Sequence, residues 1–157
     1  MSVKRTLSVC RLCNFFETMP RCLGIDFGKK RVGLAISDPE GIIAQPFGAI
    51  EWDDLDELIG HLKAIALEKH VETVVVGHPI YPSGDDSEMS REVGNFAERL
   101  RQALSDVKIV LVDERYSSKE AEAAIRETGK KPSRDKAAVD AVAASLILQT
   151  YLGRYVR

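Results

Sequence analysis

The sequence predicts an α/β domain built on a mixed sheet of five strands, three of them antiparallel and the last two parallel to the first. Two features of the chain lead to this prediction. Short apolar runs separated by turn residues come first, and stretches with apolar residues at helical spacing then alternate with continuous apolar runs. The chain has 157 residues, 45% hydrophobic and 29% charged, which is typical of one globular domain able to bury its own core.

The first three strands are predicted to form an antiparallel meander. Residues 22–25 and 32–36 are apolar runs separated by "DFGKK", a spacing that suits a hairpin with a tight glycine-containing turn. A second turn follows at residues 38–41. Residues 42–50 then supply a strand in which Pro46 indicates an edge position or a bulge, because proline cannot donate to the hydrogen-bond ladder.

The rest of the chain alternates helices with buried strands. The predicted order is helix 55–66, strand 73–77, helix 89–104, strand 108–112, and helices 118–127 and 135–151. Right-handed crossovers would place both later strands parallel to the first strand. Their carboxyl ends would then meet at one edge of the sheet, where functional residues of such folds collect.

Residues 1–20 are interpreted as an N-terminal extension that is disordered or not native, and the domain as residues 21–157. The extension lacks a periodicity that joins it to the next strand. A true translation start at Met19 explains the extension at least as well as a short organelle transit sequence does. Cys10 and Cys13 have no histidines at matching spacing, so we interpret the pair as chance rather than as half of a zinc site.

Composition narrows the class of protein further. The formal charge is -2 and the isoelectric point about 6.0, so any anionic partner must be held by a local cluster of cations. Apolar stretches are too short to span a bilayer, and three cysteines cannot form a disulfide scaffold. We therefore expect a soluble protein of a reducing compartment, the cytoplasm, with no membrane partner, acting as a monomer or homodimer.

Three acidic positions are predicted to converge at the carboxyl edge of the sheet. Asp26 ends the first strand, and Asp113 and Glu114 end the last. Asp140 lies on a face of the final helix that is lined by small and apolar side chains. Converging carboxylates repel one another, and a divalent cation with oxygen ligands resolves that repulsion. Simpler interpretations are a turn residue at Asp26 and an ion pair of Asp140 with Lys136. Asp113 and Glu114 point to opposite faces, so at most one of them faces the site.

Cations accompany each acidic position. They are Lys29, Lys30, Arg31, Arg115, Lys130, Lys131, Arg134 and Lys136. Such runs usually belong to a solvated face, but their proximity to the three carboxylates predicts a groove that follows a nucleic-acid backbone. We expect the loop at residues 130–136 to close over the substrate.

Four motifs carry a resemblance to a known family: "GIDFGKKRVGLAISDPEGIIAQP", "VVVGHPIYPSG", "VDERYSS" and "KAAVDAVAASLILQTYL". In this order and spacing the chain resembles the YqgF/RuvX family of Holliday-junction-resolvase-like nucleases from Arg21 to Leu152. The resemblance implies a ribonuclease H-like fold, a five-stranded mixed sheet flanked by helices. It implies metal-dependent cleavage of phosphodiester bonds, in 5'-end maturation of pre-16S ribosomal RNA, with Asp26, Glu114 and Asp140 as catalytic metal ligands.

The expected mechanism is hydrolysis with one or two Mg²⁺ or Mn²⁺ ions, on precursor ribosomal RNA or on branched DNA. The family more often has an apolar or aromatic residue before the proline at position 79, where this chain has His78. We expect His78 to be a loop residue rather than a catalytic base. Two other classes stay open. An ATP-binding phosphotransferase shares the opening hairpin but needs two such lobes, and a non-catalytic partner protein would carry a vestigial acidic site.

Overall fold

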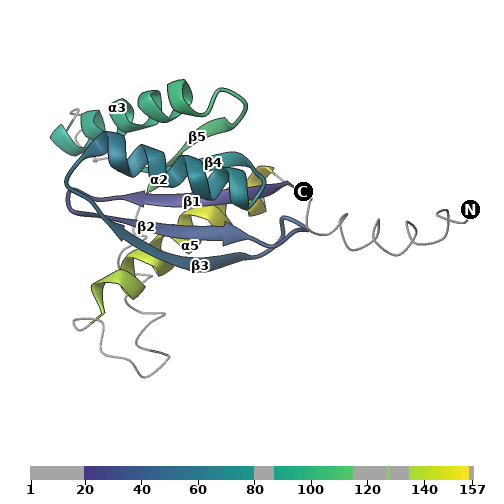
Figure 1. Ribbon diagram of the computed structural model, residues 1–157. Coiled ribbons are helices and arrows are strands. Elements are labelled where there is room, and N and C mark those ends of the chain that lie inside the picture. Colours follow the sequence, from purple (N-terminus) through teal and green to yellow (C-terminus); the bar gives the residue numbers. More distant parts are fainter. Residues whose placement is uncertain (1–19, 80–86, 115–126, 128–134, 156–157) are drawn as a thin grey trace, which may run out of the picture.

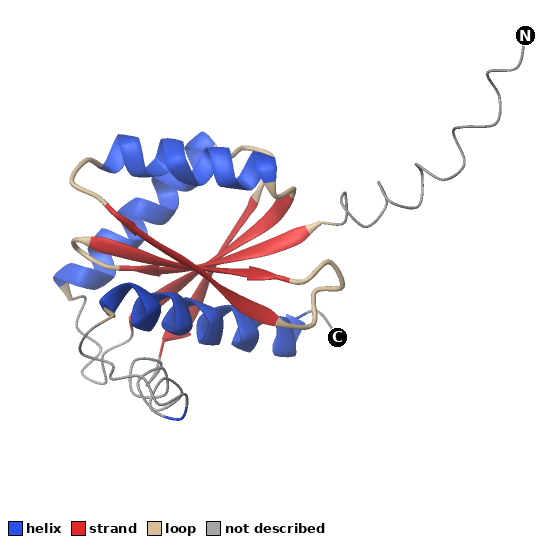
Figure 2. Ribbon diagram, turned by 60° about the horizontal axis from the view of Figure 1, so that its bottom comes forward, coloured by secondary structure: helices blue, strands red, loops and turns tan. Residues whose placement is uncertain are grey.

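The computed structural model describes residues 20–79, 87–114, 127 and 135–155. They form one sheet with helices on both faces (Figure 1). The elements in chain order are β1 (Arg21–Phe27), β2 (Arg31–Ser37), β3 (Ala44–Glu51), α2 (Leu55–Glu68), β4 (Val71–Pro79), α3 (Glu88–Ala103), β5 (Lys108–Glu114) and α5 (Lys136–Tyr155). Helices α2 and α3 cover one face of the sheet and α5 covers the other (Figure 2).

The five-stranded sheet has the order β3-β2-β1-β4-β5. The pairs of β2 with β1 and β3 are antiparallel, whereas β4 is parallel to both β1 and β5. This topology confirms the predicted mixed sheet, with the first strand at its centre. The helix predicted at residues 118–127 lies outside the described residues except for Glu127.

Strand β3 forms one edge of the sheet and contains a bulge. Leu34 of β2 is opposite Gly48, but the next residue, Ala35, is opposite Pro46, so Phe47 is the extra residue. Gly48 adopts a φ of 132°, a region that favours glycine. Pro46 therefore has both of the positions predicted for it, at an edge and next to a bulge.

Side-chain caps begin the helices close to where the sequence predicts them. Asp54 Oδ1 accepts a hydrogen bond from the Glu57 amide at 2.9 Å, and Ser87 Oγ accepts one from Ser90 at 3.1 Å. Asp135 Oδ1 accepts from the Ala138 amide at 3.0 Å and starts α5. This last helix continues to Tyr155, four residues beyond the predicted end.

The two faces of the sheet bury separate apolar clusters, and strand alternation decides which side chains enter each. In β1, Leu23, Ile25 and Phe27 pack with α2 and α3. The intervening Gly24 lies against α5, because a Cβ there would be 2.7 Å from Leu148 Cβ. Asp26 has the same phase as Gly24 and so lies on the α5 face. Within the described ranges, no helix is both long and apolar enough to span a membrane.

Candidate active site at the junction of β1, β2 and α5

Asp26 lies in the central strand, near the carboxyl end of β1. The parallel strands β4 and β5 end at the same edge of the sheet. It is half-buried, and its direct neighbour across the antiparallel pair is Gly33 of β2. The parallel ladder with β4 ends at Ile25 and Val76, one residue before Asp26. A carboxylate at this position is held by regular strand geometry rather than by a turn, so the turn interpretation of Asp26 is wrong.

Asp140, on α5, lies against the same glycine from the face of the sheet that α5 covers. A Cβ on Gly33 would collide with the carbonyl group of Asp140 and come within 3.0 Å of its Cβ. Helix α5 can lie this close to β2 because residue 33 has no side chain. Asp26 and Asp140, 114 positions apart in the sequence, therefore both lie against Gly33 and on one face of the sheet.

The third predicted acidic position is at the end of β5. In the parallel ladder, His78 is level with Asp113, and Pro79 is level with Glu114. Val110 and Val112 pack on the α5 side, so strand position 114 has the phase of that face and Asp113 has the opposite phase. The side chain of Glu114 lies outside the described residues. The described part of the chain contains no group of three or more acidic, histidine or cysteine residues that could hold a metal ion.

Arg31, the first residue of β2, joins Asp140 of α5 to Glu51 of β3. Its Nε donates to Asp140 Oδ2 at 2.5 Å, and its Nη1 lies 3.6 Å from Glu51 Oε1. The hydrogen bond that Arg31 donates to Asp140 raises the pKa of the Arg31 guanidinium, which stays charged. The simpler interpretation of Asp140 named the wrong partner, because the ion pair joins it to Arg31 and not to Lys136. Arg31, predicted as a nucleic-acid contact, is engaged by this carboxylate.

The two neighbouring lysines also have acidic partners. Lys29 Nζ lies 3.7 Å from Glu88 and 3.9 Å from Glu92 at the start of α3. Lys30 Nζ lies 3.6 Å from Asp53. These side chains are well exposed, so such pairs exchange readily with solvent or another anion. Lys136 is exposed on the first turn of α5. Arg115, Lys130, Lys131 and Arg134, and with them most of the predicted closing loop, lie outside the described residues.

His78 is part of strand β4 and not of a loop, which corrects the prediction for this residue. Its Nε2 is 2.9 Å from Ser90 Oγ in the first turn of α3. The ladder to β5 continues through residue 79, and this backbone pairing keeps residue 78 in extended conformation. The sequence around "VVVGHPIYP" gave no sign of the strand's length, because the apolar run ends at Val76.

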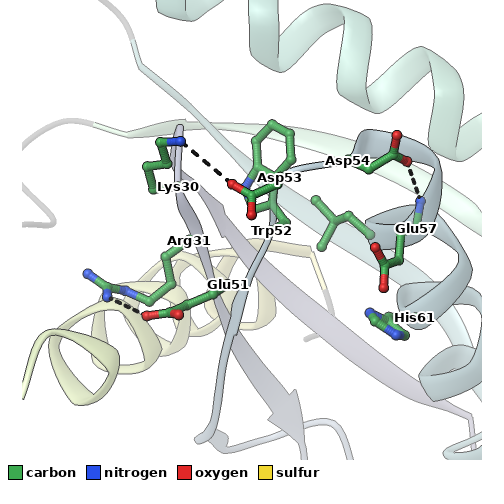
Figure 3. A pocket seen from close by; sticks show the side chains of 9 residues that line it. Lys30, Arg31, Glu51, Trp52, Asp53, Asp54, Glu57 and His61 are labelled. Atoms are coloured by element: carbon green, nitrogen blue, oxygen red, sulfur yellow. Dashed lines mark hydrogen bonds and ion pairs between the residues drawn. The ribbon is translucent and has the colours of Figure 1, made fainter.

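A pocket of about 450 Å³ lies between the start of β2, the end of β3 and α2, and neither Asp26 nor Asp140 lines it. Its lining comprises Lys30, Arg31, Glu51, Trp52, Asp53, Asp54, Glu57, Leu58 and His61 (Figure 3). Trp52 Nε1 donates to the Gly28 carbonyl at 3.0 Å and so ties the end of β3 to the β1–β2 turn. No local pattern in the sequence indicates this pocket, because its residues come from separate segments without a shared motif.

Two solved structures share the fold of this sheet and its helices. The chain is similar to Thermus thermophilus RuvC in complex with a Holliday junction substrate, with a TM-score of 0.57, 17% identity, and coverage of 86% of this chain and 97% of RuvC. It is also similar to the fowlpox virus resolvase solved with Holliday junction DNA, with a TM-score of 0.55, 10% identity, and coverage of 87% and 99%. The fold is ribonuclease H-like, as predicted.

Sequence comparison narrows this class to one family. The family model RuvX, described as Holliday junction resolvase, matches residues 20–154, and the chain belongs to this family of nucleases. A relative from Maridesulfovibrio salexigens is 42% identical over 134 residues, covering 85% of this chain and 98% of the relative. A relative from Salinibacter ruber is 41% identical over 136 residues, covering 85% and 93%. Both are named "Putative pre-16S rRNA nuclease".

Proposed function

We propose that the chain is a metal-dependent nuclease that hydrolyses phosphodiester bonds in the maturation of the 5' end of pre-16S ribosomal RNA. Asp26, Glu114 and Asp140 are proposed to bind Mg²⁺ or Mn²⁺ and to form the catalytic site. The observation that carries this proposal is the convergence of Asp26 and Asp140 on Gly33, from β1 and α5. The names of the two relatives described above support precursor 16S ribosomal RNA as the substrate.

The chemistry of these residues suits a hard divalent cation. Asp26 and Asp140 are half-buried carboxylates, and oxygen ligands of this kind are the ones that Mg²⁺ and Mn²⁺ prefer. Gly33 of β2, the strand neighbour of Asp26, leaves no Cβ between β2 and the part of α5 that carries Asp140. When bound, such an ion supplies activation of water and stabilisation of the leaving oxygen. The carboxylates hold and orient it, and no covalent intermediate on the protein is needed.

The proposed contacts to the RNA backbone come from the cations around the acidic pair. Lys29 and Lys30 form ion pairs in which the side chains are 55% and 87% exposed, so phosphate groups can replace their present partners at little cost. Lys136 adds an exposed cation on α5. The proposal also assigns this role to Arg115, Lys130, Lys131 and Arg134. For Arg31 the ion pair with Asp140 favours a different role, which is developed below.

A cleavage experiment tests the proposal. The purified chain is incubated with precursor 16S ribosomal RNA, an unstructured single-stranded RNA and a four-way DNA junction, each in Mg²⁺, Mn²⁺ and EDTA. We expect cleavage of the precursor in either metal, none in EDTA, and a loss of several orders of magnitude in Asp26→Asn, Glu114→Gln and Asp140→Asn. Cleavage in EDTA, or full activity of Asp26→Asn, would contradict the metal mechanism.

The second candidate function is resolution of branched DNA. One observation favours it, the description of the matching family model as Holliday junction resolvase. Preferential cleavage of the four-way junction over the precursor RNA would establish this alternative and overturn the RNA assignment. The proposed setting is the bacterial cytoplasm, as for an rRNA-processing enzyme, and the proposed state is a monomer or a homodimer.

A further inference from the structure

We propose that Arg31 is a positioning residue of the metal site, which holds one oxygen of Asp140 so that the other stays available to the divalent cation. This inference rests on the proposed function, because it concerns the same acidic site. It assigns Arg31 a role different from the phosphate contact that its place in the "KKR" run predicts.

The contacts of Arg31 distinguish it from the two lysines before it. Its side chain is 24% exposed, compared with 55% for Lys29 and 87% for Lys30. Its Nε donates to Asp140 Oδ2, while its Nη1 is close to Glu51 of β3. The guanidinium is thus held by carboxylates from two different elements, and Figure 3 shows it extending beside α5 toward Glu51. A side chain held in this way is poorly placed to follow a phosphate backbone.

The contact also determines which part of the Asp140 carboxylate is engaged. Among the described residues, the hydrogen bond to this group involves Oδ2 alone. The main chain of Asp140 is fixed independently by its close approach to Gly33. With the main chain and one oxygen both fixed, the rotamer of Asp140 is set before a metal ion binds. Such outer hydrogen bonds orient ligands, and their loss typically lowers metal affinity by about 10–100-fold.

Two other roles for Arg31 make different predictions. If Arg31 competes with the metal for Asp140, a substitution that weakens or removes the contact of Arg31 with Asp140 would raise the metal affinity. An arginine that contacts phosphate would change RNA affinity in the absence of metal and leave metal affinity alone. Arg31→Lys separates these roles, because it keeps the charge but loses the planar Nε donor.

The experiment measures Mn²⁺ binding by calorimetry for the native chain, Arg31→Lys and the matched control Lys30→Arg. We expect Mn²⁺ to bind Arg31→Lys at least about tenfold more weakly and Lys30→Arg as tightly as the native chain. RNA affinity in EDTA should be unchanged in Arg31→Lys, and raised Mn²⁺ should restore most of its cleavage rate. Melting curves in EDTA confirm that each variant is folded.

Arg31→Gln provides a second variant in case Arg31→Lys does not fold. It removes a positive charge near the metal, which by itself should tighten Mn²⁺ binding, so weaker binding here again supports positioning. Mn²⁺ affinity equal to or above the native value in the folded variants would overturn the inference and leave the nuclease proposal standing. Absence of Mn²⁺ binding by the native chain would instead overturn the proposed metal site, and this inference with it.

Discussion

The contact between Gly33 and α5 leads to a prediction that links stability to the metal site. In Gly33→Ala, the new Cβ would collide with the carbonyl group of Asp140. The colliding atoms belong to the main chain, so they cannot move aside by a change of rotamer. Overpacking costs about 1–3 kcal/mol, and we expect the upper end, about 3 kcal/mol, because α5 itself must shift. For a chain of this size that loss corresponds to a fall of roughly 6–12 °C in Tm.

Three other glycines provide the comparison. Gly24→Ala would place a Cβ 2.7 Å from Leu148 Cβ and 2.8 Å from the Ala144 carbonyl, so it should also destabilise the fold. Its contact on α5 is one to two turns away from Asp140, and Mn²⁺ affinity should therefore survive. Gly60 and Gly94 lie inside helices with no atom within 4 Å of an added Cβ. Alanine at these two positions should stabilise the chain by about 0.5–1 kcal/mol.

The assay combines urea unfolding with Mn²⁺ calorimetry on these four variants. We expect Gly33→Ala to lose both stability and Mn²⁺ affinity, Gly24→Ala to lose stability alone, and the two helix variants to lose neither. Native stability and native Mn²⁺ affinity in Gly33→Ala would refute the reasoning. That result would mean that α5 can bring Asp140 close to Asp26 even when residue 33 has a side chain.

Three further predictions test other parts of the account. Asp140→Asn should lower the Tm in EDTA because Arg31 loses its ion-pair partner, and both it and Asp26→Asn should abolish stabilisation by added Mn²⁺, as measured by thermal melting. Lys130→Ala combined with Lys131→Ala should weaken RNA binding and flatten its salt dependence, as measured by titration at several salt concentrations; an unchanged slope would assign both lysines to a solvated loop. Deletion of residues 1–19 should leave the Tm and the cleavage rate unchanged, and a large drop in Tm would show that this segment packs on the domain.

The sequence alone determined the order and type of the described elements. Strands and helices differ in the period of their apolar residues. This period can be recognised in the local sequence without knowing which elements pack against it. Turn and cap chemistry is local too, so Asp54 and Asp135 mark the starts of α2 and α5, and Pro46 marks the irregular edge strand. Right-handed crossovers then left a short list of sheet topologies, which included the observed one.

Tertiary structure decided which side chains meet. The contact of Arg31 with Asp140 spans 109 positions in the sequence, and no local pattern could select Arg31 over Lys29, Lys30 or Lys136 as the partner. Which cation pairs with Asp140 depends on how closely α5 packs on β2. The absence of a side chain at Gly33 determines that distance. His78 likewise belongs to a strand because β5 supplies backbone partners beside it, a property of the neighbour and not of its own segment. Local sequence specifies elements through backbone preference, whereas ion pairs and pockets arise from distances that exist only after packing.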